Sequence, residues 1–188
     1  PVIRALDNLS VKLISTGGTK NYISSLQVPV TAVEEITAYP SIFGGRVKTL
    51  HPKIFGGILY RRDNDVDLKE TVQYDVPGID LVIVDLYPFE STVKSGAGEQ
   101  DVIEKIDIGG ISLIRAAAKN YADVLIISAQ EQYAELLQLL GDKKGESSLE
   151  DRKKFATYAF GMTSHYDTAI YHYFSAENPQ AFKQSILK

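Results

Sequence analysis

The 188-residue sequence contains no cysteine and no tryptophan. Without cysteine there are no disulfides, no thiol nucleophile and no cysteine-based metal site. Only three histidines are present, too far apart in the sequence for a convincing zinc motif, so we expect no metal. No apolar run approaches the length of a membrane span and no signal peptide pattern is visible. We therefore expect a cytoplasmic protein with no membrane partner.

An excess of positive charge is also lacking. The chain has 20 basic and 24 acidic residues and a formal net charge of −4, which argues against a general nucleic-acid binder. Any anion site must therefore be local. The hydrophobic content of 44% and the charged content of 23% are ordinary for a globular protein, and the length suits one domain or one domain with an appendage.

The most informative stretch covers residues 44–53. It opens with two glycines, which allow a close approach of the backbone to a ligand. Four potential cations follow within eight residues: Arg46, Lys48, His51 and Lys53. Arginine grips phosphate with two hydrogen bonds and lysine supplies a point charge, while Thr49 adds a hydroxyl donor. A phosphate-binding loop and a solvated basic turn both fit this segment taken alone.

A second candidate phosphate site follows the apolar residues 11–14, a predicted strand. The next five residues are Ser15, Thr16, Gly17, Gly18 and Thr19, and residues 20–26 then predict a helix. A strand, a loop of hydroxyls and glycines, and a helix form the layout in which free backbone N–H groups point at an anion. The spacing matches neither the Walker loop nor the dinucleotide fingerprint. A helix cap with a tight turn explains the residues equally well.

Residues 79–86 are the clearest predicted strand, because a nearly continuous apolar run suits a strand buried on both faces of a parallel sheet. Ligands bind beyond the carboxyl ends of such strands, which makes Tyr87 a candidate site residue; an aromatic plug at the sheet edge is the alternative. Further strands are predicted at 28–33 and 124–128. We expect shorter helices at 54–60, 68–74, 100–105, 111–120 and 131–140, and irregular chain at 34–43 and 93–99.

Two helical regions add detail. Residues 106–110 again place a carboxylate and paired glycines at a helix start, and on the following helix Arg115 and Lys119 share a face. A cation near a helix C-terminus is favourable in any case, which is the structural alternative for Lys119.

From Ser148, with Glu150 or Asp151 supporting its start, a long helix is predicted toward residue 174. Its stripe of aromatic residues is typical of packing and predicts a subunit or domain interface. The stripe comprises Phe155, Tyr158, Ala159, Met162, Tyr166, Ile170 and Tyr173.

Five segments, residues 15–19, 45–53, 85–89, 106–110 and 115–120, occur in this order. Together they closely resemble the IMP cyclohydrolase domain, the N-terminal part of the bifunctional AICAR transformylase/IMP cyclohydrolase family of purine biosynthesis. The resemblance covers nearly the whole chain. It implies a methylglyoxal-synthase-like α/β fold, a three-layer arrangement in which helices flank a parallel sheet and a long helix follows. Residues 1–140 would be the core, and 141–188 a helical extension of the same domain that makes dimer or interdomain contacts.

The resemblance also implies a reaction and its residues. In that family the carboxamide nitrogen of a formamidoimidazole-carboxamide ribotide (FAICAR) attacks the formyl carbon, water leaves, and IMP forms without metal or organic cofactor. Lys48 would lie near the formyl group, Tyr87 would donate to the developing oxyanion, and Asp107 with Lys119 would act as a coupled pair on the carboxamide side. The phosphate would be held by Ser15, Thr16, Gly17, Gly18, Thr19, Arg46 and Thr49. The base would contact Asp85, Ile108 and Gly109.

The resemblance further implies a homodimer, and a transformylase domain that is linked to this one in the full-length parent. The sequence departs from the family in two places. The family has a serine- and lysine-bearing loop after its first strand with no counterpart here, and we expect a strand and that loop to precede residue 1. The family often has asparagine where this chain has Asp85. Two other proteins of the same fold remain alternatives: methylglyoxal synthase, and a phosphate-binding regulatory domain such as that of carbamoyl phosphate synthetase.

Overall fold

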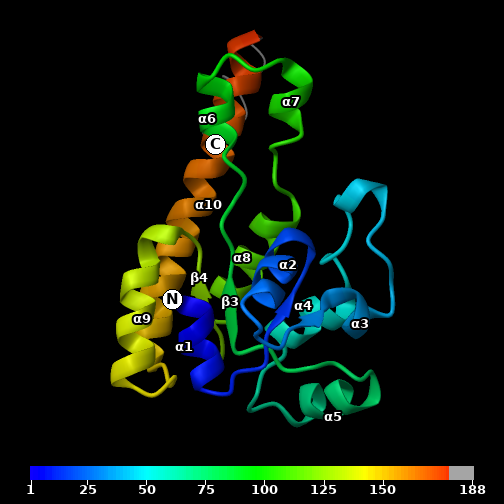
Figure 1. Cartoon of the computed structure of the whole chain (residues 1–188), viewed down its shortest axis with the longest axis vertical. Helices are drawn as coiled ribbons and strands as arrows, with labels where there is room; N and C mark the ends of the chain where they lie inside the picture. Colours follow the sequence, from blue (N-terminus) through cyan, green and yellow to red (C-terminus); the bar gives the residue numbers. More distant parts are fainter. Residues whose placement is uncertain (178–188) are drawn as a thin grey trace.

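A computed structural model describes residues 1–177 and shows short strands at the centre of a helical shell (Figure 1). The first half contains α1 (Val2–Asn8), β1 (Ile14–Ser15), α2 (Gly17–Ser25), β2 (Thr31–Ala32), α3 (Val33–Thr37), the 3-10 turn η1 (Phe43–Gly45), α4 (Pro52–Leu59) and α5 (Asp65–Gln73). The second half contains β3 (Leu81–Ile83), α6 (Phe89–Lys94), α7 (Glu99–Ile103), α8 (Gly109–Lys119), β4 (Leu125–Ile127), η2 (Gln130–Gln132), α9 (Tyr133–Asp142) and α10 (Leu149–Glu177). Residues 178–188 of the expected helical extension lie outside the described part.

The four strands named above form two parallel pairs. Ile14 lies opposite Thr31 in the β1–β2 pair, and Val82 lies opposite Ile126 in the β3–β4 pair. The first pair is short because Ser15 and Ala32 lead almost directly into helices. The predicted α/β fold with helices around parallel strands is confirmed, although the hydrogen-bonded ladder is divided between two pairs in residues 1–177.

The main core surrounds β4, whose three residues are all buried. Helix α8 packs on β3 and β4, α10 packs along α8 and β4, and α1 packs on α9. Figure 1 shows α9 and α10 on one side of these strands and α2, α3 and α4 on the other. Burial on both sides explains the continuous apolar run of β4, whereas in β3 only Val82 is buried. No helix in the described part of the chain is long and apolar enough to span a bilayer.

Several expected boundaries are corrected. The strand predicted over 11–14 is Ile14–Ser15 in the structure, and Val11 is exposed. The strand predicted over 79–86 is reduced to Leu81–Ile83, because its partner β4 has only three residues. The predicted strand 28–33 shrinks to two residues, and the region expected to be irregular from 34 holds α3, whose first turn is closed by a 3.0 Å hydrogen bond from the Ala32 N–H to Glu35. The chain after Pro88 turns at once into α6, so the loop predicted over 93–99 is shorter than expected.

The long helix starts as the sequence predicts. The Asp151 N–H donates to Ser148 Oγ at 3.2 Å, and the Ser148 N–H donates to Asp151 at 2.8 Å. These reciprocal bonds satisfy backbone donors that a helix start leaves free. Of the predicted stripe, Phe155, Ala159 and Tyr166 are buried while Tyr158 is exposed. Aromatic side chains therefore face both the core and the solvent.

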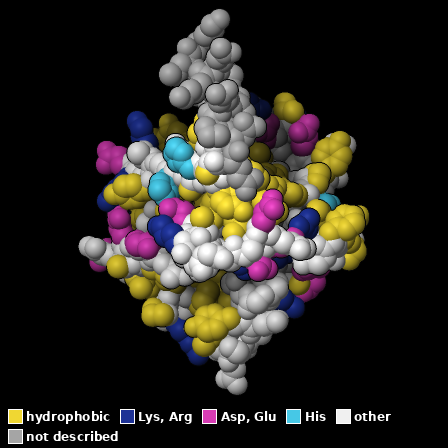
Figure 2. All heavy atoms as spheres, turned by 90° about the horizontal axis from the view of Figure 1, so that it is seen from above, with side chains coloured by type: hydrophobic (Ala, Val, Ile, Leu, Met, Phe, Trp, Pro, Cys, Tyr) yellow, Lys and Arg dark blue, Asp and Glu magenta, His cyan; other side chains and the backbone are white. Residues whose placement is uncertain are grey.

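A second, smaller core lies at one end of the molecule, where α6, α7 and the later turns of α10 meet (Figure 1). Its buried members are Phe89, Val102 and Tyr166. Figure 2 looks down on this end and shows hydrophobic side chains gathered near the middle, with acidic and basic side chains intermixed around them. This small core holds the segments that lead into the candidate site.

Candidate active site

The loop between β1 and α2 has the geometry expected of a phosphate cradle. The backbone of Thr16 is extended. Gly17 is the first residue of α2 and has a φ of +49°, which residues other than glycine rarely adopt. Gly17, Gly18 and Thr19 are exposed, and a methyl group on Gly18 would meet nothing within 4 Å. The first N–H groups of a helix have no acceptor within their own helix, so those of α2 are available to a ligand in this exposed loop.

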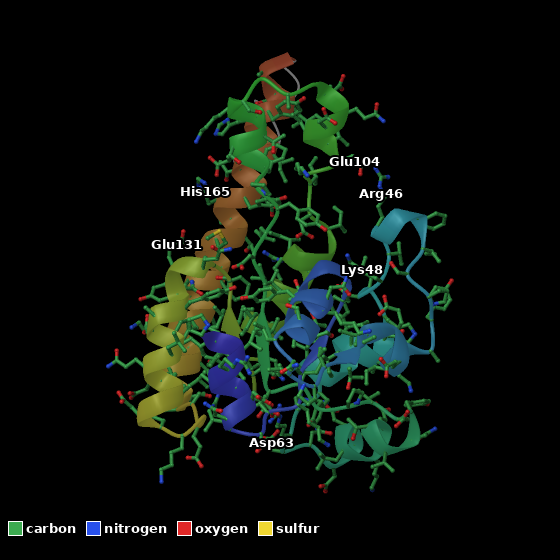
Figure 3. All side chains as sticks on the ribbon, in the orientation of Figure 1. Arg46, Lys48, Asp63, Glu104, Glu131 and His165 are labelled. Carbon is green, nitrogen blue, oxygen red and sulfur yellow. The ribbon has the colours of Figure 1, made fainter. Side chains whose placement is uncertain are left out.

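The basic loop is a tight hairpin that carries Lys48 to this cradle. A bridge between Ile42 and Val47 closes it, and three consecutive residues at its tip, Phe43 to Gly45, have positive φ angles. Half-buried Lys48 turns inward: its Nζ is 4.0 Å from the position that a Cβ on Gly17 would take. Figure 3 shows Lys48 between this loop and α2. The structure thus brings the ammonium to the loop between β1 and α2. The predicted binding of phosphate by this loop and the predicted place of Lys48 near the formyl group both stay predictions.

The start of α8 forms the third wall. The Gly110 N–H donates to Asp107 Oδ1 at 2.6 Å, so this carboxylate caps the helix. A methyl group on Gly110 would lie 2.5 Å from Asp107 Oδ2, and one on Gly109 would lie 3.1 Å from Thr49 Oγ1. Glycine is therefore required for the close approach of carboxylate and hydroxyl. Ile108 is exposed beside them, as the predicted contact with a base requires.

An open hollow of about 350 Å³ adjoins this wall. Its lining is Leu50, His51, Pro52, Phe55 and Ser112. His51 has its Nδ1 occupied as acceptor from the Lys53 N–H at 3.2 Å, where it caps α4. Lys53 itself pairs with Asp75 at 2.7 Å. Of the four cations in the basic segment, Lys53 is thus directed away from the cradle.

Arg46 is engaged elsewhere. Its guanidinium forms an ion pair with Glu104, at the end of α7, and the two side chains point toward each other in Figure 3. Both side chains are more than half exposed. The predicted contact of Arg46 with a phosphate therefore requires the guanidinium to exchange one anion for another.

The two predicted site residues after β3 have different surroundings. Tyr87 is half-exposed in the loop that leads to α6. Asp85 accepts hydrogen bonds from the Tyr133 hydroxyl at 2.6 Å and from Gln130 at 3.3 Å. Burial of the Tyr133 hydroxyl raises its pKa well above the usual range, and the hydrogen bond to Asp85 is the second, smaller cause. The predicted base contact of Asp85 competes with these bonds.

The predicted coupling of Asp107 with Lys119 is corrected in a single copy of the chain. Helix α8 has 11 residues, so about 16 Å of helix separates the two residues. Lys119 is exposed in the last turn, where its charge suits the helix dipole. Two residues near Lys119 make contacts that hold the fold together. Arg115 reaches the Thr163 hydroxyl at 3.5 Å, and the side chain of buried Asn120 donates to the Ile58 carbonyl at 2.8 Å.

One residue close to the site was not predicted to have a role there. The sequence predicts packing at a subunit or domain interface for Tyr166, but its hydroxyl also donates to the Lys105 carbonyl and accepts from the Asp107 N–H, both at 2.8 Å. Burial raises the pKa of Tyr166, which keeps the proton on its hydroxyl. Helical periodicity identifies the buried ring and carries no signal for a hydroxyl bond to a loop 59 residues away. Within residues 1–177 no cluster of three or more potential metal ligands occurs.

Comparisons with known proteins agree with this architecture. Residues 1–112 match the MGS-like domain family, and residues 117–188 match the AICARFT/IMPCHase bienzyme family. The crystal structure of a protein named ForH superposes with a TM-score of 0.80 at 31% identity, over 95% of this chain and 91% of that one. The chain belongs to the MGS-like domain family.

Its relatives narrow the assignment. The chain is 59% identical over 185 residues to the bifunctional purine biosynthesis protein PurH of Bacteroides thetaiotaomicron, covering 98% of this chain and 36% of that protein. It is 49% identical over 171 residues to PurH of Rippkaea orientalis, covering 89% and 33%. The resemblance to AICAR transformylase/IMP cyclohydrolase is thereby confirmed. The chain spans about a third of the length of these curated relatives.

Proposed function

We propose that this chain is an IMP cyclohydrolase unit, which closes the formamido ribotide to IMP in purine biosynthesis. The observation that carries the proposal is the convergence of three segments: the Gly17 cradle, the Lys48 ammonium and the start of α8. A nucleoside monophosphate presents a phosphate at one end and a base at the other, and this surface offers an anion site and an exposed isoleucine in the same order. A bifunctional, cytoplasmic, homodimeric parent with AICAR formyltransferase activity is part of the same proposal.

The phosphate is assigned to the N–H groups at the start of α2, with hydroxyls from Ser15, Thr16, Thr19 and Thr49. A helix N-terminus favours an anion through its free N–H groups and its dipole. Lys48 adds the full charge that this loop lacks. A hydrogen bond to a charged group contributes about 1.5–3 kcal/mol. Lys48 therefore supplies a major part of phosphate affinity in this proposal, in addition to any role at the formyl group.

The chemistry requires a carboxamide nitrogen to attack a formyl carbon within one molecule. The N–C bond forms as the amide nitrogen loses one proton and the formyl oxygen gains one. The C–O bond then breaks: the hydroxyl leaves as water with a second proton that comes from the formamido nitrogen, and a C=N bond forms to that nitrogen. An amide nitrogen is a weak nucleophile, so holding the two groups in contact supplies much of the acceleration. Asp107 is suited to accept the amide proton, because its capping bond to Gly110 uses Oδ1 and leaves Oδ2 for the substrate. Tyr87 is suited to donate to the developing oxyanion.

In this proposal Lys119 does not contact the substrate, since it lies at the far end of α8 from Asp107. Proton transfer is assigned to Asp107 and Tyr87. Arg46 is assigned to the phosphate only when its bond to Glu104 opens.

The test is an ultraviolet assay of the purified protein with the formamido ribotide, combined with calorimetric titration of IMP. We expect IMP to form, and Asp107→Asn to reduce turnover by at least about 100-fold, in line with the loss of general base catalysis. Asp101→Asn, an exposed carboxylate of α7, is the matched control and leaves turnover unchanged. IMP binding without turnover favours a phosphate-binding regulatory domain. If the protein neither binds IMP nor forms it, the assignment is contradicted.

A further inference from the structure

The hydroxyl of Tyr166 joins the long helix to the segment that carries Asp107. Tyr166 lies on α10 and is 6% exposed. Its hydroxyl donates to the Lys105 carbonyl and accepts from the Asp107 N–H, each at 2.8 Å. A tyrosine hydroxyl has one proton to donate, and here both its donor and an acceptor position are used. The side chain therefore fixes two backbone groups on either side of residue 106.

This segment needs such a support. Residues 104–108 connect α7 to α8 and belong to neither helix. The side chain of Asp107 is held by one hydrogen bond, in which its Oδ1 accepts from the Gly110 N–H. The backbone of Asp107 is held by a second hydrogen bond, from its N–H to the Tyr166 hydroxyl. Together the two bonds define where the carboxylate begins and where it points, so Oδ2 is held in one direction.

The ring of Tyr166 reaches the second predicted catalytic segment. It packs edge-on against Phe89, with ring centroids 6.0 Å apart, and Phe89 is 2% exposed. The Phe89 N–H donates to the Tyr87 carbonyl at 2.8 Å. Phe89 therefore lies in the same short turn as Tyr87. One buried side chain of α10 thus contacts the segments of both Asp107 and Tyr87.

We propose that Tyr166 is a positioning residue of the active site, which aligns Asp107 through its hydroxyl and the Tyr87 turn through its ring. The inference rests on the proposed cyclohydrolase function. It gives the long helix a part in catalysis beyond packing. A displacement of about 1 Å in a catalytic group is enough to lower a rate by roughly 100-fold, so a single hydroxyl is sufficient to matter.

The decisive variant is Tyr166→Phe, which keeps the ring and its contact with Phe89 and removes only the hydroxyl. We expect kcat for IMP formation to fall by about 10- to 100-fold. KM for the ribotide stays within about twofold, because the phosphate cradle lies on other segments. The matched control is Tyr173→Phe, on the same helix and in the same aromatic cluster, with its ring 5.9 Å from Phe89. It leaves kcat unchanged.

A double-mutant cycle separates positioning from general destabilisation. If Tyr166 acts through Asp107, adding Tyr166→Phe to Asp107→Asn produces little further loss of kcat, since residues that act as one unit are not additive. Losses that multiply in the double variant overturn the proposal. An equal loss in Tyr173→Phe also overturns it.

Amide hydrogen exchange tests the positioning without any turnover. In Tyr166→Phe the Asp107 amide loses its acceptor and exchanges at least about 10-fold faster, while in Tyr173→Phe its rate is unchanged. An unchanged rate in Tyr166→Phe shows that the hydroxyl does not hold the segment, and overturns the proposal. If the unmodified protein makes no IMP, the cyclohydrolase assignment fails, and the exchange rates still decide whether Tyr166 holds Asp107 in place.

Discussion

Arg46 and Glu104 form an ion pair that joins the basic loop to the end of α7 (Figure 3). The two residues are 58 positions apart in the sequence, so the pair joins two distant segments. Glutamate therefore occupies the guanidinium that the family resemblance assigns to the substrate phosphate. In the proposed complex the Glu104 carboxylate and the substrate phosphate compete for the Arg46 guanidinium. The effect of this competition on ligand affinity can be measured.

Replacing Glu104 with glutamine removes the competing charge and keeps the shape of the side chain. The pair is more than half exposed, so its free energy is at most about 1 kcal/mol. We expect IMP to bind to Glu104→Gln up to about fivefold more tightly in calorimetric titrations at low ionic strength. Glu99→Gln, an exposed change in the first turn of α7, serves as control. Weaker binding to Glu104→Gln would mean that the ion pair holds the site open for the ligand.

Lys48 and Lys53 give a second comparison within the same loop. Lys48 lies over the cradle, while Lys53 is bound to Asp75. We expect Lys48→Ala to raise the Kd for IMP by about 10- to 100-fold, the equivalent of one charged hydrogen bond. Lys53→Ala changes it less than twofold. If Lys48→Ala instead lowers kcat and leaves the Kd of IMP unaltered, Lys48 acts at the formyl group alone.

Local patterns in the sequence predict the elements that form the site. The strand before the glycine loop, the loop itself and the strand before Tyr87 each have a local cause. The structure contains all three, although both strands have other bounds than predicted and only Val82 of β3 is buried. The capping pair Ser148 and Asp151 is equally local, because its partners are three residues apart.

Contacts between distant segments are what the sequence does not reveal. The bond between Tyr166 and Asp107 spans 59 residues, and the pair of Arg46 and Glu104 spans 58. Neither follows from periodicity or from helix signals. The coupling predicted for Asp107 and Lys119 is not made within one copy of the chain, since a straight helix of 11 residues keeps its ends apart. Motif membership therefore identified the candidates and gave no distance between them.

The start of α10 predicts a pH-dependent stability. Lys143 and Ser148 hold the pKa of Asp151 at about 2, below the ordinary 3.8. A depressed pKa contributes stability that is complete above about pH 4 and is lost as the pH falls from there toward 2. At pH 7 we expect Asp151→Asn to destabilise the protein by about 1 kcal/mol, roughly 2–4 °C in Tm. The difference from the unmodified protein shrinks below pH 4 in thermal unfolding curves.

Glu150→Gln is the control for Asp151. Glu150 lies in the same first turn and also interacts with the helix dipole, but takes no part in the bonds that close the turn. A Tm difference in Asp151→Asn that stays constant from pH 7 to pH 2 would contradict the capping interpretation. Equal losses in both variants would assign the effect to the dipole instead.

Two glycines in helices should respond to alanine with opposite signs. A Cβ on Gly57 of α4 would lie 2.2 Å from the Pro77 carbonyl oxygen and 3.2 Å from Ile79, where the Ile79 N–H donates to the Gly57 carbonyl at 3.0 Å. Alanine forces α4 away from the segment that leads into β3, so Gly57→Ala should cost more than about 2 kcal/mol of unfolding free energy. Gly161 is exposed in α10 with nothing within 4 Å, and Gly161→Ala should add about 0.5–1 kcal/mol. Urea unfolding measures both, and a Gly57→Ala protein as stable as the unmodified one would show that α4 does not pack closely on residues 77–79.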